Sequence, residues 1–383
     1  MTGATPSSQI EKHRRFSARA VLLGLAAPVG ALVFAALVCT AILVVSKHSP
    51  ADVVDSMVTS AKRPRTFVIA LNNATNYYLA AVAVAIGFRM NLFNIGVDGQ
   101  YRLAAMLAAA LAGASFMDGL PPFLRIAMTI IAAMAVGAAW AGIAGFLKVT
   151  RGVSEVISTI MLNAIATALV AFLLNPNRLA VLTGNDIHTP EITAGGQVPG
   201  IPYPGTSSAT VHGLIIVAAA VGVLYWFVLA RTRFGFDLKA TGLSESAAVA
   251  SGVNVKKMVF LSMLLSGGVA GLVGMPELLG GAHSYSLNFP PGIGFIGIAV
   301  ALLGRNHPVG IAFASLLWGI LDASSNGLDV SGVPKEIVAI MQGVIVLSVV
   351  VAYELVRRYR VRLEQNEVGR ALGRTQVPEA VSS

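Results

Sequence analysis

The chain has 383 residues, of which 55% are hydrophobic and only 12% are charged. A soluble domain carries about a quarter charged residues, so this composition excludes a soluble globular protein and predicts that most of the chain lies in a membrane. The net charge of +9 is not gathered in a basic patch with interleaved aromatic residues, so we expect no nucleic-acid binding.

The N-terminal segment, residues 1–19, is polar and basic and is predicted to lie in the cytoplasm. The apolar run that follows, about 27 residues, is too long for the core of a cleavable signal peptide and predicts a retained first span. The single cysteine, Cys39, lies in this run. It excludes a disulfide within the chain and reads as a small buried apolar side chain.

Spanning helices need about 20 mostly apolar residues, and about ten segments meet or approach this length. The sequence therefore predicts an all-α polytopic membrane protein. The eighth segment is short and interrupted by glycines. The predicted spans are 20–46, 66–88, 94–116, 123–147, 155–175, 211–230, 258–280, 292–304, 308–326 and 335–356.

The distribution of Lys and Arg predicts the orientation, because these residues concentrate on the cytoplasmic side of membrane proteins. With residues 1–19 inside and an even number of spans, both termini are cytoplasmic and most of the 27 basic residues lie on the inner side. The cluster Lys62–Arg65 is the exception, since it falls outside. The positive charge is therefore mainly the orientation signal of a multi-pass protein of the cytoplasmic membrane.

Polar side chains recur inside the predicted spans, most densely in "NLFNIGVDGQYRLAAM", which begins at Asn91. Such residues are rare in membranes and face the protein interior or a water-filled cavity. Contact with a solute and hydrogen bonding between helices both remain open. For Asp98 a buried ion pair with Arg102, one turn on, is a further alternative. The other groups are Asn72, Asn73 and Asn76; Glu155 and Asn163; Glu277, His283 and Asn288; and Asp322 and Asn326.

Glycines interrupt two apolar runs, "FNIGVDGQ" and "PPGIGFIGIAVALLG". Glycine permits a broken helix whose freed backbone groups face a cavity, which is a recurrent way to build a solute site at mid-membrane. Close helix packing through Gly292, Gly294 and Gly297 is the alternative.

Two loops and a tail complete the chain. The outer loop, about residues 176–210, is rich in Pro and Gly and predicts irregular structure. The inner loop, residues 231–257, predicts a short cytoplasmic helix over Ser244–Ser251 between Gly242 and Gly252. The basic tail, residues 357–383, is predicted to be cytoplasmic and disordered.

Catalytic motifs are absent from the sequence: it holds no HExxH, no GxSxG and no Gly-Lys dipeptide of a phosphate-binding loop. The six histidines include no pair at i, i+4, and no Cys/His cluster has zinc spacing. We therefore expect neither an enzyme nor a metal site.

Four blocks carry a resemblance to a known family: "RMNLFNIGVDGQYRLAAMLAA", "EVISTIMLNAIATAL", "GFDLKATGLSESAAVASGV" and "GIGFIGIAVALLGRNHPVG". In this order they resemble the permease subunits of bacterial ABC importers, in the group of branched-chain amino-acid, ribose and nucleoside permeases. The "FNIGVDGQ" block is more similar to the nucleoside and simple-sugar branch. The resemblance covers about residues 66–356, so residues 20–356 are expected to form the transmembrane permease domain.

The resemblance implies a type II importer with about ten spans per permease subunit. Two permeases, identical or paralogous, sit on two cytoplasmic ABC ATPases, and a substrate-binding lipoprotein docks on the outer face. This chain would carry no cofactor, since ATP and Mg²⁺ bind the partner ATPase. The inner loop resembles the coupling helix that contacts the ATPase. That comparison singles out Gly242, Glu245, Ser246, Ala247, Ala248 and Gly252, with Ser246 where the family has Glu.

The expected function is nucleoside or simple-sugar import, driven by ATP in the partner subunits. Amide and carboxylate groups suit ribose hydroxyls and base edges, and an aromatic ring can stack on a base. The residues expected to line or brace the passage are Phe93, Asn94, Asp98, Gln100, Glu155, Asn163 and Phe295. The alternatives are an ion-coupled secondary transporter, an ABC permease for ribose or branched-chain amino acids, and a structural membrane anchor.

Overall fold

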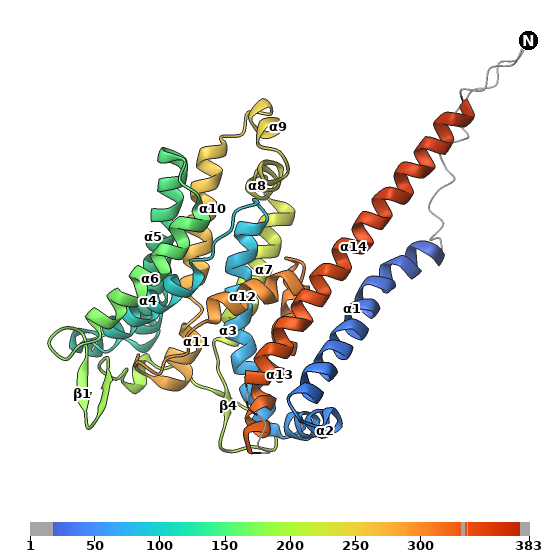
Figure 1. The fold of residues 1–383 in the computed structure, drawn as a ribbon. Coiled ribbons are helices and arrows are strands. Elements are labelled where there is room, and N and C mark those ends of the chain that lie inside the picture. The colour runs from blue at the N-terminus through green and yellow to red at the C-terminus, as the bar shows by residue number, and fades with distance from the viewer. Residues whose placement is uncertain (1–17, 331–333, 335, 376–383) are drawn as a thin grey trace, which may run out of the picture. The chain divides into compact units, whose positions relative to one another are not determined.

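The computed structural model describes residues 18–330, 334 and 336–375. The chain divides into two compact units, residues 1–50 with 340–383 and residues 51–339. The first unit holds α1 (Ala18–Val45) and most of α14 (Glu336–Thr375), and Figure 1 shows both as long helices. The predicted cytoplasmic segment, residues 1–19, lies almost wholly outside the described residues.

The second unit holds the other helices and four short strands in two antiparallel pairs, β1 with β2 and β3 with β4. Its longer helices are α3 (Pro64–Phe88), α5 (Pro122–Arg151), α6 (Glu155–Leu173), α7 (Ile215–Arg231), α10 (Val255–Gly271) and α13 (Pro308–Val330). Its shorter elements are α2 (Pro50–Ala61), α4 (Val97–Ala112), η1 (Ser115–Gly119), β1 (Val181–Thr183), β2 (Asp186–His188), η2 (Ala194–Gly196), β3 (Ile201–Pro202), β4 (Thr210–Val211), α8 (Arg233–Leu243), α9 (Glu245–Ala250), α11 (Met275–Glu277), η3 (Leu278–Ala282) and α12 (Ile293–Leu303).

The membrane spans agree in part with the sequence. Within the described ranges, six helices are long and apolar enough to cross a membrane, or up to eight if two bent helix pairs each form one span. All ten predicted segments contain helix, but α4 has 16 residues and α12 only 11. At 1.5 Å per residue these two fall short of the roughly 30 Å hydrocarbon core of a bilayer. The chain is a multi-pass helical membrane protein, and the count of ten spans stays a prediction.

The prediction of a disordered tail after residue 356 was wrong for residues 357–375. Helix α14 continues without interruption to Thr375, and residues 376–383 lie outside the described part. This part of the tail is rich in Arg, a strong helix former. An ion pair at i, i+4 between Glu354 and Arg358, with 2.8 Å between the side chains, links the apolar part of α14 to this polar extension.

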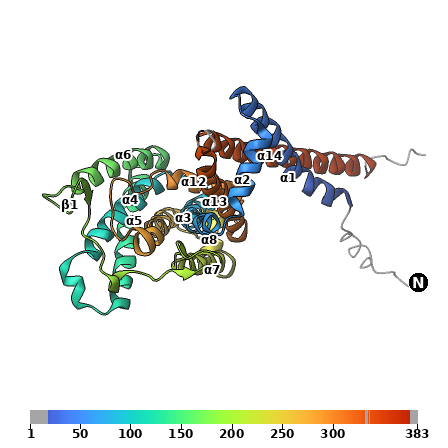
Figure 2. The same ribbon diagram turned by 90° about the horizontal axis from the view of Figure 1, so that it is seen from below.

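Helix α3 forms the centre of the second unit and packs against α10, α12 and α13. Figure 2 shows it end-on among these neighbours. Its segment Ala80–Ala85 is completely buried. Small side chains let neighbouring backbones approach: an added Cβ on Gly297 of α12 would lie 2.8 Å from the backbone carbon of Ala80. Close packing through Gly297, one of the sequence alternatives, is therefore realised here.

The second close crossing joins α5 and α10. Gly137 of α5 faces Gly267 and Gly271 of α10, and a Cβ on Gly137 would overlap the backbone of both. Small residues at such a crossing let van der Waals packing hold helices together where lipid offers no hydrophobic drive. This contact fixes α5 against α10.

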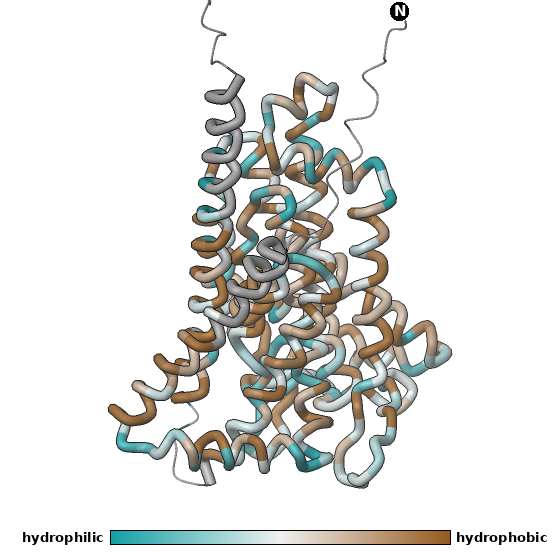
Figure 3. The backbone as a smooth tube through the Cα atoms, turned by 90° about the vertical axis from the view of Figure 1, so that its right-hand side faces the viewer, coloured by the Kyte–Doolittle hydropathy of each residue, from teal (hydrophilic) through white to brown (hydrophobic). Residues whose placement is uncertain are grey.

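The two ends of the second unit differ in character. The outer loop forms the two strand pairs, and its backbone also bonds to the segment after α11: Thr189 N donates to Tyr285 O at 2.9 Å and Val198 N to Leu279 O at 2.8 Å. The inner loop forms α8 and α9 at the opposite end, as Figure 1 shows. Hydrophobic residues predominate along the long helices, while the turns at both ends carry hydrophilic residues (Figure 3).

Candidate solute pathway and coupling surface

A buried amide cluster lies at the start of α4. Asn94 Nδ2 donates to Gln100 Oε1 at 3.0 Å and to Ser266 Oγ at 2.8 Å, and Gln100 Nε2 donates back to Asn94 Oδ1 at 2.8 Å. Ser266 in turn donates to the Ala83 carbonyl at 2.7 Å. Asn94 and Gln100 are each only 1% exposed. Both side chains are used in joining α3, α4 and α10, which is the bracing role the sequence allowed.

Asp98 caps a different helix. Its Oδ1 accepts a hydrogen bond from Gly294 N, 3.2 Å away, in the first turn of α12. A carboxylate is favourable there because the first backbone N–H groups of a helix are unpaired and carry partial positive charge. Gly292 precedes α12 with φ +84°, and a Cβ on Gly294 would lie 2.6 Å from the Asp98 Cα. The two glycines therefore permit the α4–α12 contact.

The ion pair between Asp98 and Arg102 is not formed among the described residues. Arg102 Nη1 instead donates to Thr167 Oγ1 at 3.2 Å, and its guanidinium lies beside Tyr285. Arg102 thus joins α4 to α6 and to the segment before α12.

Glu155 and Asn163 both join α6 to the segment before α4. Glu155 Oε2 pairs with Lys148 Nζ at 2.6 Å, and its other oxygen accepts from Phe93 N at 3.4 Å. Asn163 accepts from Gly99 N and donates to the Ile95 carbonyl, each at 2.9 Å. Glu155 is the first residue of α6, so its charge lies at a helix end with a partner nearby.

Phe93 and Phe295 are the two predicted pathway residues whose side chains are exposed on this chain. Phe93 is 46% exposed and Phe295 is 50% exposed. Phe93 stands edge-on to Phe88 with 5.2 Å between ring centroids. Phe295 follows Gly294, whose backbone packs against Asp98 at the start of α4. Contact of any of these residues with a solute stays a prediction.

Two further polar groups of the spans serve separate contacts, while the amide oxygen of Asn76 is buried without a hydrogen-bond partner among the described residues. Asp322 Oδ2 accepts from Asn73 Nδ2 at 2.8 Å and from Tyr77 Oη at 3.0 Å, which joins α13 to α3. Asn72 bonds to the outer loop through the Thr210 carbonyl and the His212 amide. Polar groups thus hold α3 against its surroundings along much of its length.

A histidine pair lies at the outer end of the second unit. Gly281 separates His212 from the Glu277 carboxylate: a Cβ there would lie 3.1 Å from both side chains. Burial, together with the neighbouring His283, lowers the pKa of His212 to about 4, so the ring is neutral at pH 7. His283 has φ +55° and ends the π-helical turn η3. Among the described residues, the Nδ1 atoms of both rings are buried without a hydrogen-bond partner.

The inner loop contains the predicted short helix and one that the sequence analysis missed. Helix α9 spans Glu245–Ala250, and Ser244 caps it by accepting from Ala247 N at 3.3 Å. Gly252 ends the turn with φ +80°. Helix α8, "RFGFDLKATGL", was not predicted, although Thr232 directly before it is a favourable N-cap residue. Thr232 caps it by accepting from Gly235 N at 3.1 Å.

The surface of this loop exposes large apolar side chains. Leu243 is 89% exposed, Phe236 68% and Val249 61%. Glu245, Ser246 and Ala247 are exposed beside them, whereas Ala248 is buried. Exposed apolar groups on a polar loop mark an interaction surface. The sequence analysis selected the Ala248 region but did not single out the three apolar residues, whose exposure depends on how α8 and α9 fold back.

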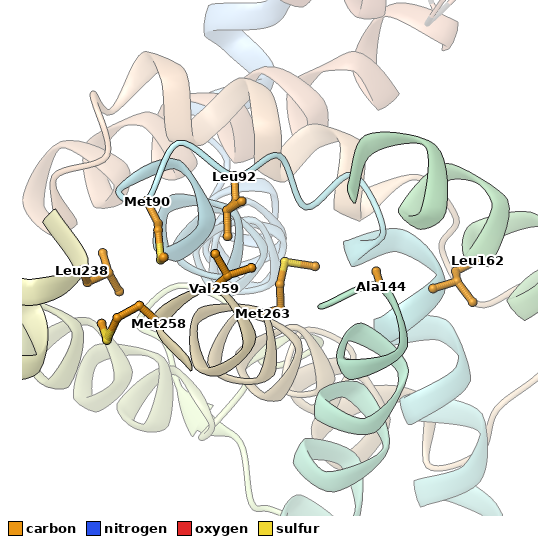
Figure 4. Packing of buried hydrophobic residues seen from close by; sticks show 8 residues of the cluster. All are labelled: Met90, Leu92, Ala144, Leu162, Leu238, Met258, Val259 and Met263. Carbon is orange, nitrogen blue, oxygen red and sulfur yellow. The ribbon is translucent and has the colours of Figure 1, made fainter. Parts of the chain in front are cut away.

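A shared core connects the inner loop to the segment before α4. Figure 4 shows Leu238 of α8 in the same cluster as Met90 and Leu92. The cluster also takes residues from α5, α6 and α10. Gly242 lies against the backbone of Met90, where a Cβ would come within 2.9 Å of the Met90 Cα. Helix α8 is therefore packed firmly onto the chain that leads to Phe93.

Comparison with known proteins gives consistent matches. Residues 66–350 match the family described as "Branched-chain amino acid transport system / permease component". The chain is 38% identical to the guanosine ABC transporter permease protein NupP of Bacillus subtilis, covering 74% of this chain and 81% of that protein. It is 32% identical to the nucleoside ABC transporter permease protein NupB of Lactococcus lactis, covering 85% and 90%. The glucose ABC transporter permease protein TsgB13 of Haloferax volcanii is 32% identical, covering 76% and 77%.

Proposed function

Since this chain belongs to the family of branched-chain amino acid transport system permease components, we propose that it is the membrane-spanning subunit of an ATP-driven nucleoside importer. The observation that carries this proposal is the similarity to the guanosine and nucleoside permeases over most of both chains. A comparable similarity to a glucose permease supports simple sugars as the alternative substrate class. The subunit moves its solute without changing a covalent bond.

The solute route is proposed to pass the exposed rings of Phe93 and Phe295. Their π faces can stack on a nucleobase, and both rings are exposed on this chain. The buried residues act as positioning groups: Asn94 and Gln100 fix the start of α4, and Asp98 fixes the start of α12. Affinity for the solute then resides mainly in an extracytoplasmic binding protein, which delivers it to the outer mouth.

The partners are proposed from the family, and two surfaces of the second unit support their placement. A cytoplasmic ABC ATPase docks on α8 and α9, where Phe236, Leu243 and Val249 supply apolar contact area. ATP and Mg²⁺ bind that partner. A second permease, identical or paralogous, completes a type II importer with about ten spans per subunit and both termini in the cytoplasm. The substrate-binding lipoprotein meets the opposite end, at the outer loop.

Coupling is proposed to run through the shared core of α8 and the segment before α4. A movement imposed on α8 displaces Met90 and Leu92, because close-packed side chains transmit displacement rather than absorb it. Phe93 follows directly along the chain, and Glu155 holds its backbone N–H. The ATPase and the solute must each favour one of two arrangements of this segment for transport to be driven.

Uptake in cells tests the proposal. A strain that lacks this chain is compared with the complemented strain for uptake of radiolabelled guanosine, with unlabelled adenosine, glucose or leucine as competitor. We expect uptake only in the complemented strain, competition by adenosine, and loss of uptake on ATP depletion but not on collapse of the proton gradient. Competition by leucine alone would contradict the proposal that the substrate is a nucleoside. Uptake that follows the proton gradient would replace the ATP-driven importer by an ion-coupled transporter.

A further inference from the structure

A polar cavity of about 610 Å³ lies at the outer end of the second unit, apart from the proposed solute route. Its walls come from α2, from the first turns of α3 and from the end of α13. It contains Arg63 and Arg65, the residues whose outer location departs from the usual distribution of basic charge. It also contains two carboxylates, Asp52 and Asp55, and the amide of Asn326. Hydroxyl groups from Ser56, Thr59, Ser60 and Thr66 complete its polar lining.

Helix α2 shows why this cavity lies at the membrane surface. With 100° between successive residues, its side chains form three stripes about a third of a turn apart. Val53, Met57 and Ser60 are buried against the rest of the unit. Asp52, Asp55, Ser56 and Thr59 line the cavity. Val54 and Val58, at i, i+4, are 54% and 44% exposed. A helix that combines a charged stripe with an outward apolar stripe is typical of the membrane interface.

The position of α3 also places the cavity at the membrane interface. Helix α3, a candidate membrane span by its length and apolar composition, begins at Pro64, between the two arginines. Its first turn therefore lies near the outer boundary of the hydrocarbon core, where phospholipid headgroups are found. Ile69, one turn deeper, gives the cavity an apolar side toward the bilayer.

We propose that this cavity binds the headgroup of an outer-leaflet phospholipid with a phosphate and a primary ammonium, that is, a phosphatidylethanolamine. The arginines suit the phosphate, since guanidinium groups form charge-assisted hydrogen bonds with phosphate oxygens. The carboxylates of α2 suit the ammonium, whose N–H groups a choline headgroup lacks. The two charge pairs have no net charge, which favours a zwitterionic over an anionic headgroup. The bound lipid would place its phosphate beside the arginines and its ammonium beside the carboxylates, and would tie α2 to α3 and α13.

Native mass spectrometry of the purified full-length chain in detergent tests the proposal. The protein is incubated with phosphatidylethanolamine, phosphatidylglycerol and phosphatidylcholine of identical acyl chains. We expect preferential retention of phosphatidylethanolamine, and roughly tenfold less of it bound to the double variant Arg63→Gln, Arg65→Gln. The matched control is Lys62→Gln, which removes a neighbouring outer cation that does not line the cavity, and which should leave retention unchanged. Equal retention of the three lipids by the wild type would overturn the proposal.

A second variant tests the carboxylates. Asp55→Asn should shift the preference from phosphatidylethanolamine toward phosphatidylglycerol, because it weakens the ammonium contact and removes a repulsion from anionic headgroups. Soluble glycerophosphoethanolamine should compete only weakly if the acyl chains contribute to binding; full competition would point to a water-soluble ligand instead. If the arginine variant keeps its lipid but loses affinity for a purified extracytoplasmic binding protein in nanodiscs, the cavity is a protein-docking site. The lipid-binding readouts do not depend on transport, so they are independent of the proposed function.

Discussion

The start of α4 and the α8–α9 loop invert the usual distribution of polar and apolar residues. Around α4, amide and carboxylate side chains are buried in the membrane part of the protein, and each has hydrogen-bond partners. In the loop, large apolar side chains face water, with Leu243 89% exposed. Buried polar groups with satisfied bonds specify one arrangement of helices. Exposed apolar groups on a polar loop indicate a surface that binds a partner.

The difference separates two kinds of functional residue. A substitution near α4 should act through the structure of the subunit, so that stability and transport fall together. A substitution on the loop surface should spare the subunit and weaken its assembly with the ATPase. Measuring stability and transport side by side therefore distinguishes the two regions.

Gly294→Ala should have the largest effect. The new Cβ would lie 2.6 Å from the Asp98 Cα, and backbone cannot move aside as a flexible side chain can. Overpacking of this kind should lower the free energy of unfolding by about 3 kcal/mol, with loss of uptake. Thermal unfolding of the purified protein in detergent measures this. The control, Gly268→Ala, meets its nearest atom only at 3.8 Å and should be close to neutral. Equal effects of the two variants would refute the close contact.

Asn94→Ala tests the amide cluster itself. It removes the partner of Gln100 and one acceptor of the Gly96 amide, and it leaves buried polar groups without bonds. An unsatisfied buried group costs about 1–3 kcal/mol, so we expect a loss of about 2.5 kcal/mol and a parallel loss of uptake. The exposed Asn177→Ala serves as control. Full stability with lost uptake would instead show that Asn94 contacts the solute directly.

Helix positions could be predicted from the sequence because a membrane span leaves a long apolar run. Helix α9 was also found, from Ser244 and the glycines at its ends. The irregular structure predicted for the outer loop was wrong where β1 to β4 form two strand pairs. The tail was misjudged because its charged residues are also strong helix formers. Helix α8 was missed although Thr232 marks its start, because it follows directly after the apolar run of α7.

The candidate site was only partly predictable. Polar residues in apolar runs identified the α4 region, but a sequence does not show which groups bond to one another. Asp98 is an example: its spacing suggested Arg102 as partner, whereas it binds Gly294, 196 residues away. The exposure of Leu243 likewise depends on tertiary packing, since leucine in sequence is an ordinary sign of burial.

His212 allows a pH-dependent test, because its ring is buried and one ring nitrogen has no hydrogen-bond partner among the described residues. Its pKa is lowered to about 4 in the folded protein, against 6.5 for the ordinary group. Between pH 4 and pH 6.5 the unfolded chain binds more protons than the folded protein. The stability that the neutral ring contributes is therefore fully present above pH 6.5 and falls as the pH drops toward 4. Lowering the pH from 7.5 to 5 should cost about 2 kcal/mol through this residue. His212→Gln should remove that part of the slope in thermal unfolding; identical slopes would contradict it.

Leu243→Ser should have the smallest effect on the subunit and a selective effect on assembly. The side chain makes little contact within the chain, so the free energy of unfolding should change by less than about 0.5 kcal/mol. An apolar anchor at a protein interface is worth more, and we expect about tenfold weaker binding of the partner ATPase, or about 1.4 kcal/mol. Binding is measured with the purified ATPase on permease in nanodiscs, together with uptake in cells.

The control for this last substitution is Leu287→Ser, which removes a leucine of similar exposure (68%) from the segment between α11 and α12. It should leave ATPase binding unchanged, because that segment bonds to the outer loop at the other end of the unit. Equal loss of binding in both variants would indicate a nonspecific effect of surface apolarity. Unchanged binding in Leu243→Ser would show that the ATPase does not dock on this part of α8 and α9. Only the role assigned to the α4 region would then be supported.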